Sequence, residues 1–462
     1  MFASYNKLAL QDTLKNLLTL TGLTRRQLVA SPTLQLENTV TDIRQLSITD
    51  LPALKSIKLQ DFAKSIVTLH LENLPALQSI EANGNALQKL ELQGCEKLQT
   101  LQCNENQIQE LELENLPALQ ELHCEFNQLK TLEIAGMPVL HTIMVNNNQL
   151  SSMQLQDCQA LSYFDCRTNQ FSQIEFASMP KIKHIDCSYN KFVRLDIPVL
   201  EKLESLYCHA NQLQTLNVNH LSTLQALICD RNQLTELRLE NLTVLQEVNC
   251  SKNQITSLHL SNLPSIAFLN CSENPLQRLD VTEFTSLTHL FCEDNQLQEL
   301  DVRPLSKLEL LNYGKNNLPE VDLSTLPNLI NFECYETNSV DLDLSVLKSV
   351  DYIDCSDNRL TNLRIDGLEE LQDIHCKNNK LTFLSFVDLP KLRWIDCSEN
   401  ELLAIRMQNL PELEGLDCSE NRIKLLDLTG LSKLKEIDCD GNGKMLIAGV
   451  KTTDLGDWPA KD

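Results

Sequence analysis

The chain of 462 residues is 42% hydrophobic and 5% aromatic, and its 39 basic and 63 acidic residues give a formal net charge of -24 at pH 7. Such an acidic chain is repelled by nucleic acid and by anionic membrane surfaces, so we expect neither as a partner. The sequence shows neither a cleavable signal peptide nor an apolar run of membrane-spanning length, so we expect a protein that is cytoplasmic, or secreted without a cleaved signal peptide.

Residues 1–30 precede the regular part of the sequence and predict a helical N-terminal cap. Leu10, Leu14 and Leu17 recur at helical spacing, and Gly22 suits the end of a helix. The first unit of a repeat protein needs a cover for its apolar end and its edge strand. We therefore expect these residues to cover the first coil of the fold that follows.

Two units open the regular part with a longer spacing. The equivalent segments that begin at Leu51 and Leu74 lie 23 residues apart, which predicts a two-residue insertion at 62–65. Counting inward-facing strand centres from Leu34 to Ile437 predicts about 20 coils.

From Asn85 to Asn442 the sequence repeats every 21 residues without insertion or deletion. Asparagine occupies one position of every repeat except one, where Thr337 replaces it. Counted from the asparagine, apolar residues recur at +2, +5, +7, +10, +13 and +16, cysteine is usual at +18 and proline is frequent at +11. Apolar and polar residues alternate before each asparagine, which predicts a strand with one buried face. A side-chain amide can pair with backbone groups of a tight turn, so we expect the asparagine row to be structural.

This pattern resembles the leucine-rich repeat, whose shared segment reads LxxLxLxxNxL with cysteine able to replace the third leucine. The unit from Leu119 to Leu140 shows it, and the 21-residue length is similar to that of the short bacterial, Irreko-like class. The resemblance covers residues 31–445 and implies a right-handed, β-rich solenoid with a parallel concave sheet. Because a coil this short leaves little room for a helix of average length, we expect strand-like or 3-10 segments on the convex side.

Seventeen cysteines are present, and their positions predict a buried row. Fifteen share one register from Cys103 to Cys439, whereas Cys95 and Cys158 replace an apolar residue elsewhere in the repeat. We expect all of them to pack in the core as small hydrophobic side chains. No CxxC spacing suggests a zinc site, and free thiols fit a reducing compartment.

Function is expected on the outward positions of the concave strands, six, four and two residues before each asparagine. Large side chains on one exposed face are typical of protein-binding surfaces, although parallel strands also favour such residues wherever they lie. The candidate partner-binding residues are Tyr163, His184, Tyr207, His209, Ile228, Phe268, His289, Phe291, Tyr352 and Trp394.

Asp396, Asp417 and Asp438 occupy equivalent positions in the last coils. Neighbouring strands lie about 4.8 Å apart, so these carboxylates would either repel one another or share a cation. The further oxygen ligands and the loop that calcium needs are not evident in the sequence. We expect a solvated acidic face, no metal and no cofactor.

Two stretches depart from the pattern. At Thr337 and Ser339 both the asparagine and the leucine at +2 are lost, and Tyr313 takes the cysteine position of the preceding repeat. Three interpretations are open there: a bulky interior, a local bend, and a repeat that has merely drifted from the consensus, which we favour. After Asn442 the pattern lapses, and residues 446–462 are expected to form a C-terminal cap or tail.

No motif of a nucleophile, a phosphate-binding loop or a catalytic metal site is present, so we do not expect an enzyme. The sequence predicts a monomeric protein–protein interaction scaffold, of bacterial type, that binds a partner through the concave face. The partner would be basic or partly hydrophobic. Two alternatives stay open, namely a structural or spacer solenoid without a specific ligand, and a host-targeted bacterial effector that acts by binding. The acidic charge also serves simply to keep a long, thin molecule soluble.

Overall fold

The computed structural model describes residues 17–18, 21–36, 44–59, 66–176, 179–318 and 321–449. The chain divides into two compact units, Met1–Leu234 (unit 1) and Thr235–Asp462 (unit 2), and each is described by itself. The insertion expected at 62–65 and the residues after Gly449 lie outside the described part of the chain.

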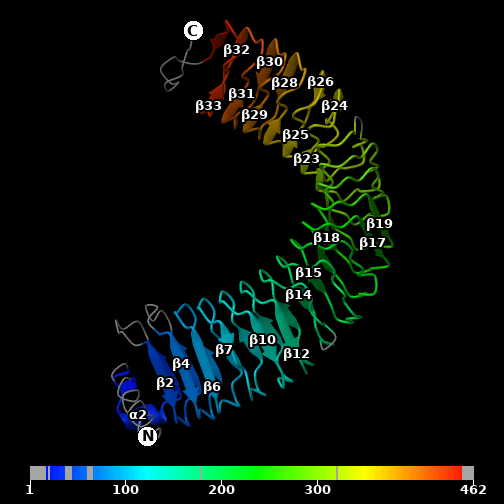
Figure 1. Ribbon diagram of the computed structural model, residues 1–462. Coiled ribbons are helices and arrows are strands. Elements are labelled where there is room, and N and C mark those ends of the chain that lie inside the picture. Colours follow the sequence, from blue (N-terminus) through cyan, green and yellow to red (C-terminus); the bar gives the residue numbers. More distant parts are fainter. Residues whose placement is uncertain are drawn as a thin grey trace. The chain divides into compact units, whose positions relative to one another are not determined.

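In unit 1 each coil contributes one strand to a parallel sheet, the concave sheet of unit 1 (Figure 1). Its strands are β1 (Thr33–Leu36), β3 (Ser56–Leu59), β5 (Ser79–Glu81), β7 (Thr100–Gln102), β9 (Glu121–His123), β11 (Thr142–Met144), β13 (Tyr163–Asp165), β14 (His184–Asp186), β15 (Ser205–Tyr207) and β16 (Ala226–Ile228). Pairing joins equivalent positions of successive coils, so that Leu122 lies between Leu101 and Ile143. Residues that share a repeat position therefore form rows across the sheet.

Unit 2 has a concave sheet of the same design. Its strands are β18 (Glu247–Asn249), β20 (Phe268–Asn270), β21 (His289–Phe291), β22 (Leu310–Asn312), β23 (Asn331–Glu333), β25 (Tyr352–Asp354), β27 (Asp373–His375), β29 (Trp394–Asp396), β31 (Gly415–Asp417) and β33 (Glu436–Asp438). The described part of each unit holds ten such strands, in agreement with the predicted number of coils.

Shorter sets of parallel strands lie on the outer, convex side of the coils (Figure 1). In unit 1 they are β2 (Gln45–Thr49), β4 (Thr68–Glu72), β6 (Lys89–Gln93), β8 (Glu110–Leu111), β10 (Thr131–Ile134) and β12 (Ser152–Leu155). In unit 2 they are β17 (Glu236–Glu240), β19 (Ser257–Ser261), β24 (Asp341–Asp343), β26 (Asn362–Arg364), β28 (Phe383–Val387), β30 (Ala404–Gln408), β32 (Leu425–Asp427) and β34 (Leu446–Ala448). The predicted strand-like convex segments are confirmed, and β34 continues the ladder beyond residue 445 by pairing with β32.

The predicted N-terminal cap is seen in part. Leu17 and Thr21 are helical, and a short helix, α2 (Arg25–Ala30), follows. It begins at Thr24, whose hydroxyl accepts a hydrogen bond from the backbone N–H of Gln27 (3.4 Å), while the Gln27 side chain accepts one from the Thr24 N–H (3.0 Å). The helical cap is a minor part of the fold, and residues 1–16 lie outside the described part of the chain. Among the described residues, no helix has the length and apolar character needed to cross a membrane.

The asparagine row holds the turns of successive coils together. In Asn127, Nδ2 donates to the carbonyl of Cys103 in the preceding coil (2.9 Å) and to that of Cys124 in its own coil (3.1 Å), while Oδ1 accepts from the N–H of Ile108 (2.9 Å). The residue just before it, Phe126, has φ 53°, a conformation that side chains other than glycine adopt at a cost. The amide thus satisfies backbone groups that this tight turn would leave unpaired, which confirms the structural role expected of the row.

All 17 cysteines are free and buried, as predicted. Burial raises the pKa of the Cys103 thiol to about 12 and that of Cys95 to about 11. Since the thiolate is the reactive form, these thiols are poor nucleophiles at neutral pH. They serve the core as small apolar groups.

Of the interpretations open near Thr337, the structure shows the bulky interior. The Tyr313 ring is buried and packs edge to face on Phe332, with ring centroids 5.7 Å apart. Thr337 replaces the amide with a hydroxyl, which donates to the carbonyl of Cys334 in its own coil (2.9 Å). Its short side chain cannot span to the preceding coil as an asparagine does.

Candidate functional site

The outward rows of unit 1 bring part of the candidate set together. Tyr163 and His184 face each other across β13 and β14, with ring centroids 6.0 Å apart. The next row pairs Tyr207 on β15 with Ile228 on β16. His209 lies two residues beyond Tyr207, outside the strand, and is half-buried. These five residues therefore occupy three adjacent rows rather than one pocket.

His209 is fixed by the preceding coil. Its Nδ1 lies 2.8 Å from the Ser188 hydroxyl, and its ring meets the Tyr189 ring edge to face at 5.1 Å. Tyr189 is 53% exposed and precedes the row asparagine, with φ 52°. The sequence analysis missed Tyr189 because it considered only strand positions; the signal was an aromatic residue at a turn position that is mostly polar in other repeats.

Two acidic residues on the same strands are buried rather than outward. The Asp165 carboxylate is fully buried and accepts hydrogen bonds from the Asn146 side chain (2.9 Å) and the Arg167 backbone N–H (3.1 Å). The Arg167 guanidinium also lies 3.3 Å from the Asp186 carboxylate. Burial raises the pKa of Asp165 to about 6, and the nearby Asp186 charge adds to this effect. This arrangement positions Arg167 on the concave face as a fixed cation.

In unit 2 the structure brings three candidates into one aromatic cluster. The Phe268 ring lies 6.0 Å from that of His289 and 5.5 Å from that of Phe291, measured between centroids. All three come from the adjacent strands β20 and β21. Their tilted rings are half-buried, which leaves part of each surface accessible for contact with another molecule.

The other two unit 2 candidates are seated separately. Tyr352 on β25 packs against His375 on β27, with ring centroids 5.5 Å apart. The Trp394 ring lies over Gly415 in the next coil so closely that a Cβ there would overlap the ring. The absence of a side chain at Gly415 therefore leaves the space that the indole occupies.

A second aromatic residue on a glycine was not predicted. The Tyr335 ring covers Gly314 of the preceding coil, where an added Cβ would lie 2.6 Å from the ring atom Cε1. The sequence signal was the pair itself, an aromatic residue 21 positions after a glycine in the same row. Burial, together with the charges of nearby carboxylates such as Asp354, raises the pKa of both Tyr335 and Tyr352 to about 12.

The three carboxylates Asp396, Asp417 and Asp438 accept hydrogen bonds within their own coils. Asp396 Oδ1 accepts hydrogen bonds from the N–H and hydroxyl of Ser398 (3.1 and 2.6 Å), and Asp417 is bound in the same way by Ser419 (3.0 and 2.7 Å). Asp438 accepts the backbone N–H of a residue two positions on (3.0 Å). Within the described ranges, no group of three or more His, Cys, Asp or Glu is arranged to hold a metal ion.

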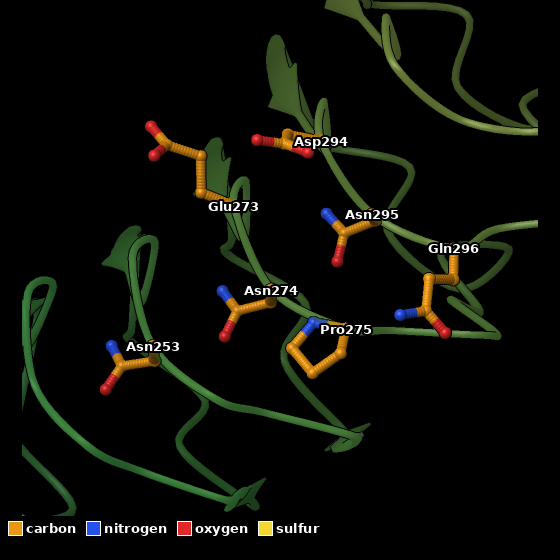
Figure 2. Close-up of a pocket in the computed structure, with 7 residues that line it drawn as sticks. All are labelled: Asn253, Glu273, Asn274, Pro275, Asp294, Asn295 and Gln296. Atoms are coloured by element: carbon orange, nitrogen blue, oxygen red, sulfur yellow. The ribbon is translucent and has the colours of Figure 1, made fainter.

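A shallow depression of about 280 Å³ lies along the turns of unit 2, away from the candidate residues (Figure 2). It is lined by Asn253, Glu273, Asn274, Pro275, Asp294, Asn295 and Gln296. Two of its amides are committed to the fold, since Asn274 donates to Cys250 O (3.1 Å) and Asn295 to Cys271 O (3.2 Å). The depression brings together carboxylates and structural amides, with no acid–base pair or nucleophile among them.

Comparison with known proteins agrees with this architecture. A family model described as leucine-rich repeats in two copies matches residues 96–136, and no curated protein matches the chain. Among solved structures, the chain is similar to YopM from Yersinia enterocolitica, with 23% identity, a TM-score of 0.70 and coverage of 89% of this chain and 90% of that one.

A second similar structure is the functional domain of InlJ from Listeria monocytogenes, which includes a cysteine ladder; identity is 26%, the TM-score 0.60, and 73% of this chain and 70% of that chain are covered. A leucine-rich-repeat protein from Leptospira interrogans is 22% identical, with a TM-score of 0.51 and coverage of 82% and 93%. The repeat register, the stacked parallel strands and these likenesses together show that the chain has the fold of a leucine-rich-repeat solenoid.

Proposed function

We propose that the chain is a non-enzymatic protein-interaction scaffold that binds a partner protein through the outward rows of its concave sheets. The observation that carries this proposal is the placement of large aromatic side chains on those rows, with the Trp394 ring against Gly415 and the Tyr335 ring against Gly314. Rigid aromatic side chains with one accessible face are the residue type most enriched where proteins bind each other.

Strand propensity alone does not account for this placement. If parallel strands collected aromatic residues regardless of function, the convex strands would carry them too. Yet the described convex strands contain no tyrosine or tryptophan, and their phenylalanines, Phe383 and Phe386, are confined to β28. The outward concave positions, in contrast, hold Tyr163, Tyr207, Tyr335, Tyr352 and Trp394. The asymmetry between two sets of strands in the same coils supports a binding role for the concave side.

The partner that fits best is basic and partly hydrophobic. The chain carries a net charge of -24, and the aromatic groups of unit 2 lie among carboxylates such as Glu333 and Asp354. Cationic side chains can pair with such carboxylates and stack on the neighbouring rings. The buried free thiols further suit a reducing compartment, so we place this activity inside a cell, whether the producing cell or one into which the protein is delivered.

The test compares two concave variants with a matched control. Tyr163, Tyr207 and Ile228 are replaced by alanine in one variant, and Tyr352 and Trp394 in the other. The control replaces Val199 and Val346, exposed apolar residues outside the concave rows, by alanine. We expect a defined protein to be retained by the wild type and the control in quantitative affinity capture and lost with at least one concave variant. If all four proteins retain the same set, the concave surface is not the binding site and a spacer role is favoured.

A further inference from the structure

An exposed apolar row runs along the convex strands at the end of unit 2. The position four residues after the repeat asparagine opens each convex strand and points outward. In seven successive coils, the first with Glu236 and the last with Asn362 at this position, the residue is always Glu, Ser, Arg, Asp or Asn. In the next four coils it is apolar and consists of Phe383, Ala404, Leu425 and Leu446, which we call the convex apolar row.

These side chains are neighbours on the folded surface. Phe383 pairs with Ala404, and Leu425 pairs with Leu446, while β30 and β32 are in contact. Phe383, Leu425 and Leu446 are 54%, 56% and 72% exposed. Leu403, directly before Ala404, is 58% exposed and widens the row. A contiguous exposed apolar patch of this kind marks an interaction surface, because the equivalent outward position in the seven preceding coils is always polar.

Charged residues beside the row match a second copy of the same surface. Two positions further along the strands, Arg406 and Asp427 are exposed on adjacent coils. Three positions before the row, the same two coils carry Glu401 and Arg422, which pair with each other at 3.0 Å. Each flanking position thus presents a positive charge on one coil and a negative charge on its neighbour.

A twofold axis parallel to the strands and between these two coils exploits this pattern. In a dimer about such an axis, each repeat position of one copy faces the same repeat position of the other copy, and the coils of the two copies run in opposite order. Arg406 then faces Asp427 of the second copy, and Glu401 faces Arg422 of the second copy. Along the apolar row, Ala404 meets Leu425 of the second copy. None of these pairs brings like charges together.

We propose that the convex apolar row is a self-association surface on which a second copy of the chain docks about this axis. The surface spans four coils and one strand length, about 19 by 17 Å, which is smaller than the roughly 800 Å² per partner of a standard interface. The dimer is accordingly weak, with a dissociation constant on the order of tens of micromolar. It leaves the concave rows free, so it does not depend on the function proposed above.

The test is sedimentation of the full chain between about 1 and about 200 µM, with the average mass rising from that of one chain towards that of two. Arg406→Asp and Asp427→Arg each place like charges opposite each other, and we expect each variant to stay monomeric. An equimolar mixture of the two regains association, because every introduced aspartate then faces an introduced arginine and every native Asp427 faces a native Arg406. Arg364→Asp is the control, since it changes the same strand position outside the four coils and leaves association unchanged.

Three results overturn the proposal. The first is a wild-type chain that stays monomeric over the whole concentration range, as it would if another partner or segment covers the row. The second is association that survives either single charge reversal. The third is a mixture of the two variants that fails to associate although both remain folded by circular dichroism.

Discussion

Replacing Asn127 by alanine tests the asparagine row directly. The substitution removes the amide that binds the Cys103 and Cys124 carbonyls and the Ile108 N–H, and water cannot replace it because the site is buried. Each buried backbone group left unpaired costs about 1–3 kcal/mol. With four groups affected, the Glu125 carbonyl (3.2 Å) included, and some relaxation of the turn, we expect the free energy of unfolding to fall by about 3–5 kcal/mol.

Threonine provides an internal scale for this effect. In the one repeat that lacks the asparagine, the Thr337 hydroxyl keeps the bond within its own coil. Asn127→Thr should therefore cost about half as much as Asn127→Ala, and Thr337→Asn should stabilise the chain by about 1 kcal/mol. Gln128→Ala, at the next residue, is the control and should change stability by less than about 0.5 kcal/mol.

Urea unfolding followed by circular dichroism measures all four variants. Stability in a solenoid is a sum over neighbouring coils, so the loss at Asn127 should also lower cooperativity and split the transition. A loss below about 1 kcal/mol for Asn127→Ala, or equal losses for alanine and threonine, would show that the amide bonds between coils are not what holds the turns.

Three further predictions concern single groups. Because burial raises the pKa of Asp165 from 3.8 to about 6, this carboxyl favours the folded state below pH 4 and loses that contribution as the pH rises through 6. Asp165→Asn should therefore reduce the gain in stability between pH 7 and pH 4 relative to the wild type, and an unchanged pH profile would contradict this. Gly415→Ala should displace the Trp394 indole and shift its fluorescence, with no further loss of stability when combined with Trp394→Ala. The 17 buried thiols should react with a thiol reagent at pH 8 only on unfolding, and rapid reaction of the native protein would refute their burial.

The fold was predictable because its determinants recur. A row such as that of Asn127 and Asn148 makes the same bonds in every coil, so one repeat explains nearly all of them. The same recurrence placed the cysteines in the core. The N-terminal cap follows no repeat, and its helical spacing predicted only helical character, of which Leu17 and α2 are the described part.

The outward residues were less predictable because the repeat does not constrain them. Tyr163 and Trp394 were found from their position alone, but the glycine under Trp394 becomes meaningful only when neighbouring coils are compared. Asp165 shares its strand position with exposed residues, and its burial depends on Asn146 and Arg167 in and beside its coil. The convex apolar row was visible in the sequence as a change from polar to apolar residues at one repeat position.

The asparagine bonds have a consequence for how such a chain can change its length. Most asparagines of the row reach a carbonyl 24 residues earlier and an N–H 19 residues earlier, as Asn148 does with Cys124 and Leu129, whereas Asn85 reaches the Leu59 carbonyl 26 residues earlier. A two-residue change in coil length is thus tolerated when it lies away from the bonded groups, and adding or deleting a whole coil of 21 residues keeps both connections in register. Unequal recombination between repeats thus yields proteins that keep the hydrogen bonds between their coils while the outward residues change. The same rule applies to protein engineering: whole coils can be exchanged when the boundaries of the exchanged segment are placed at the asparagine.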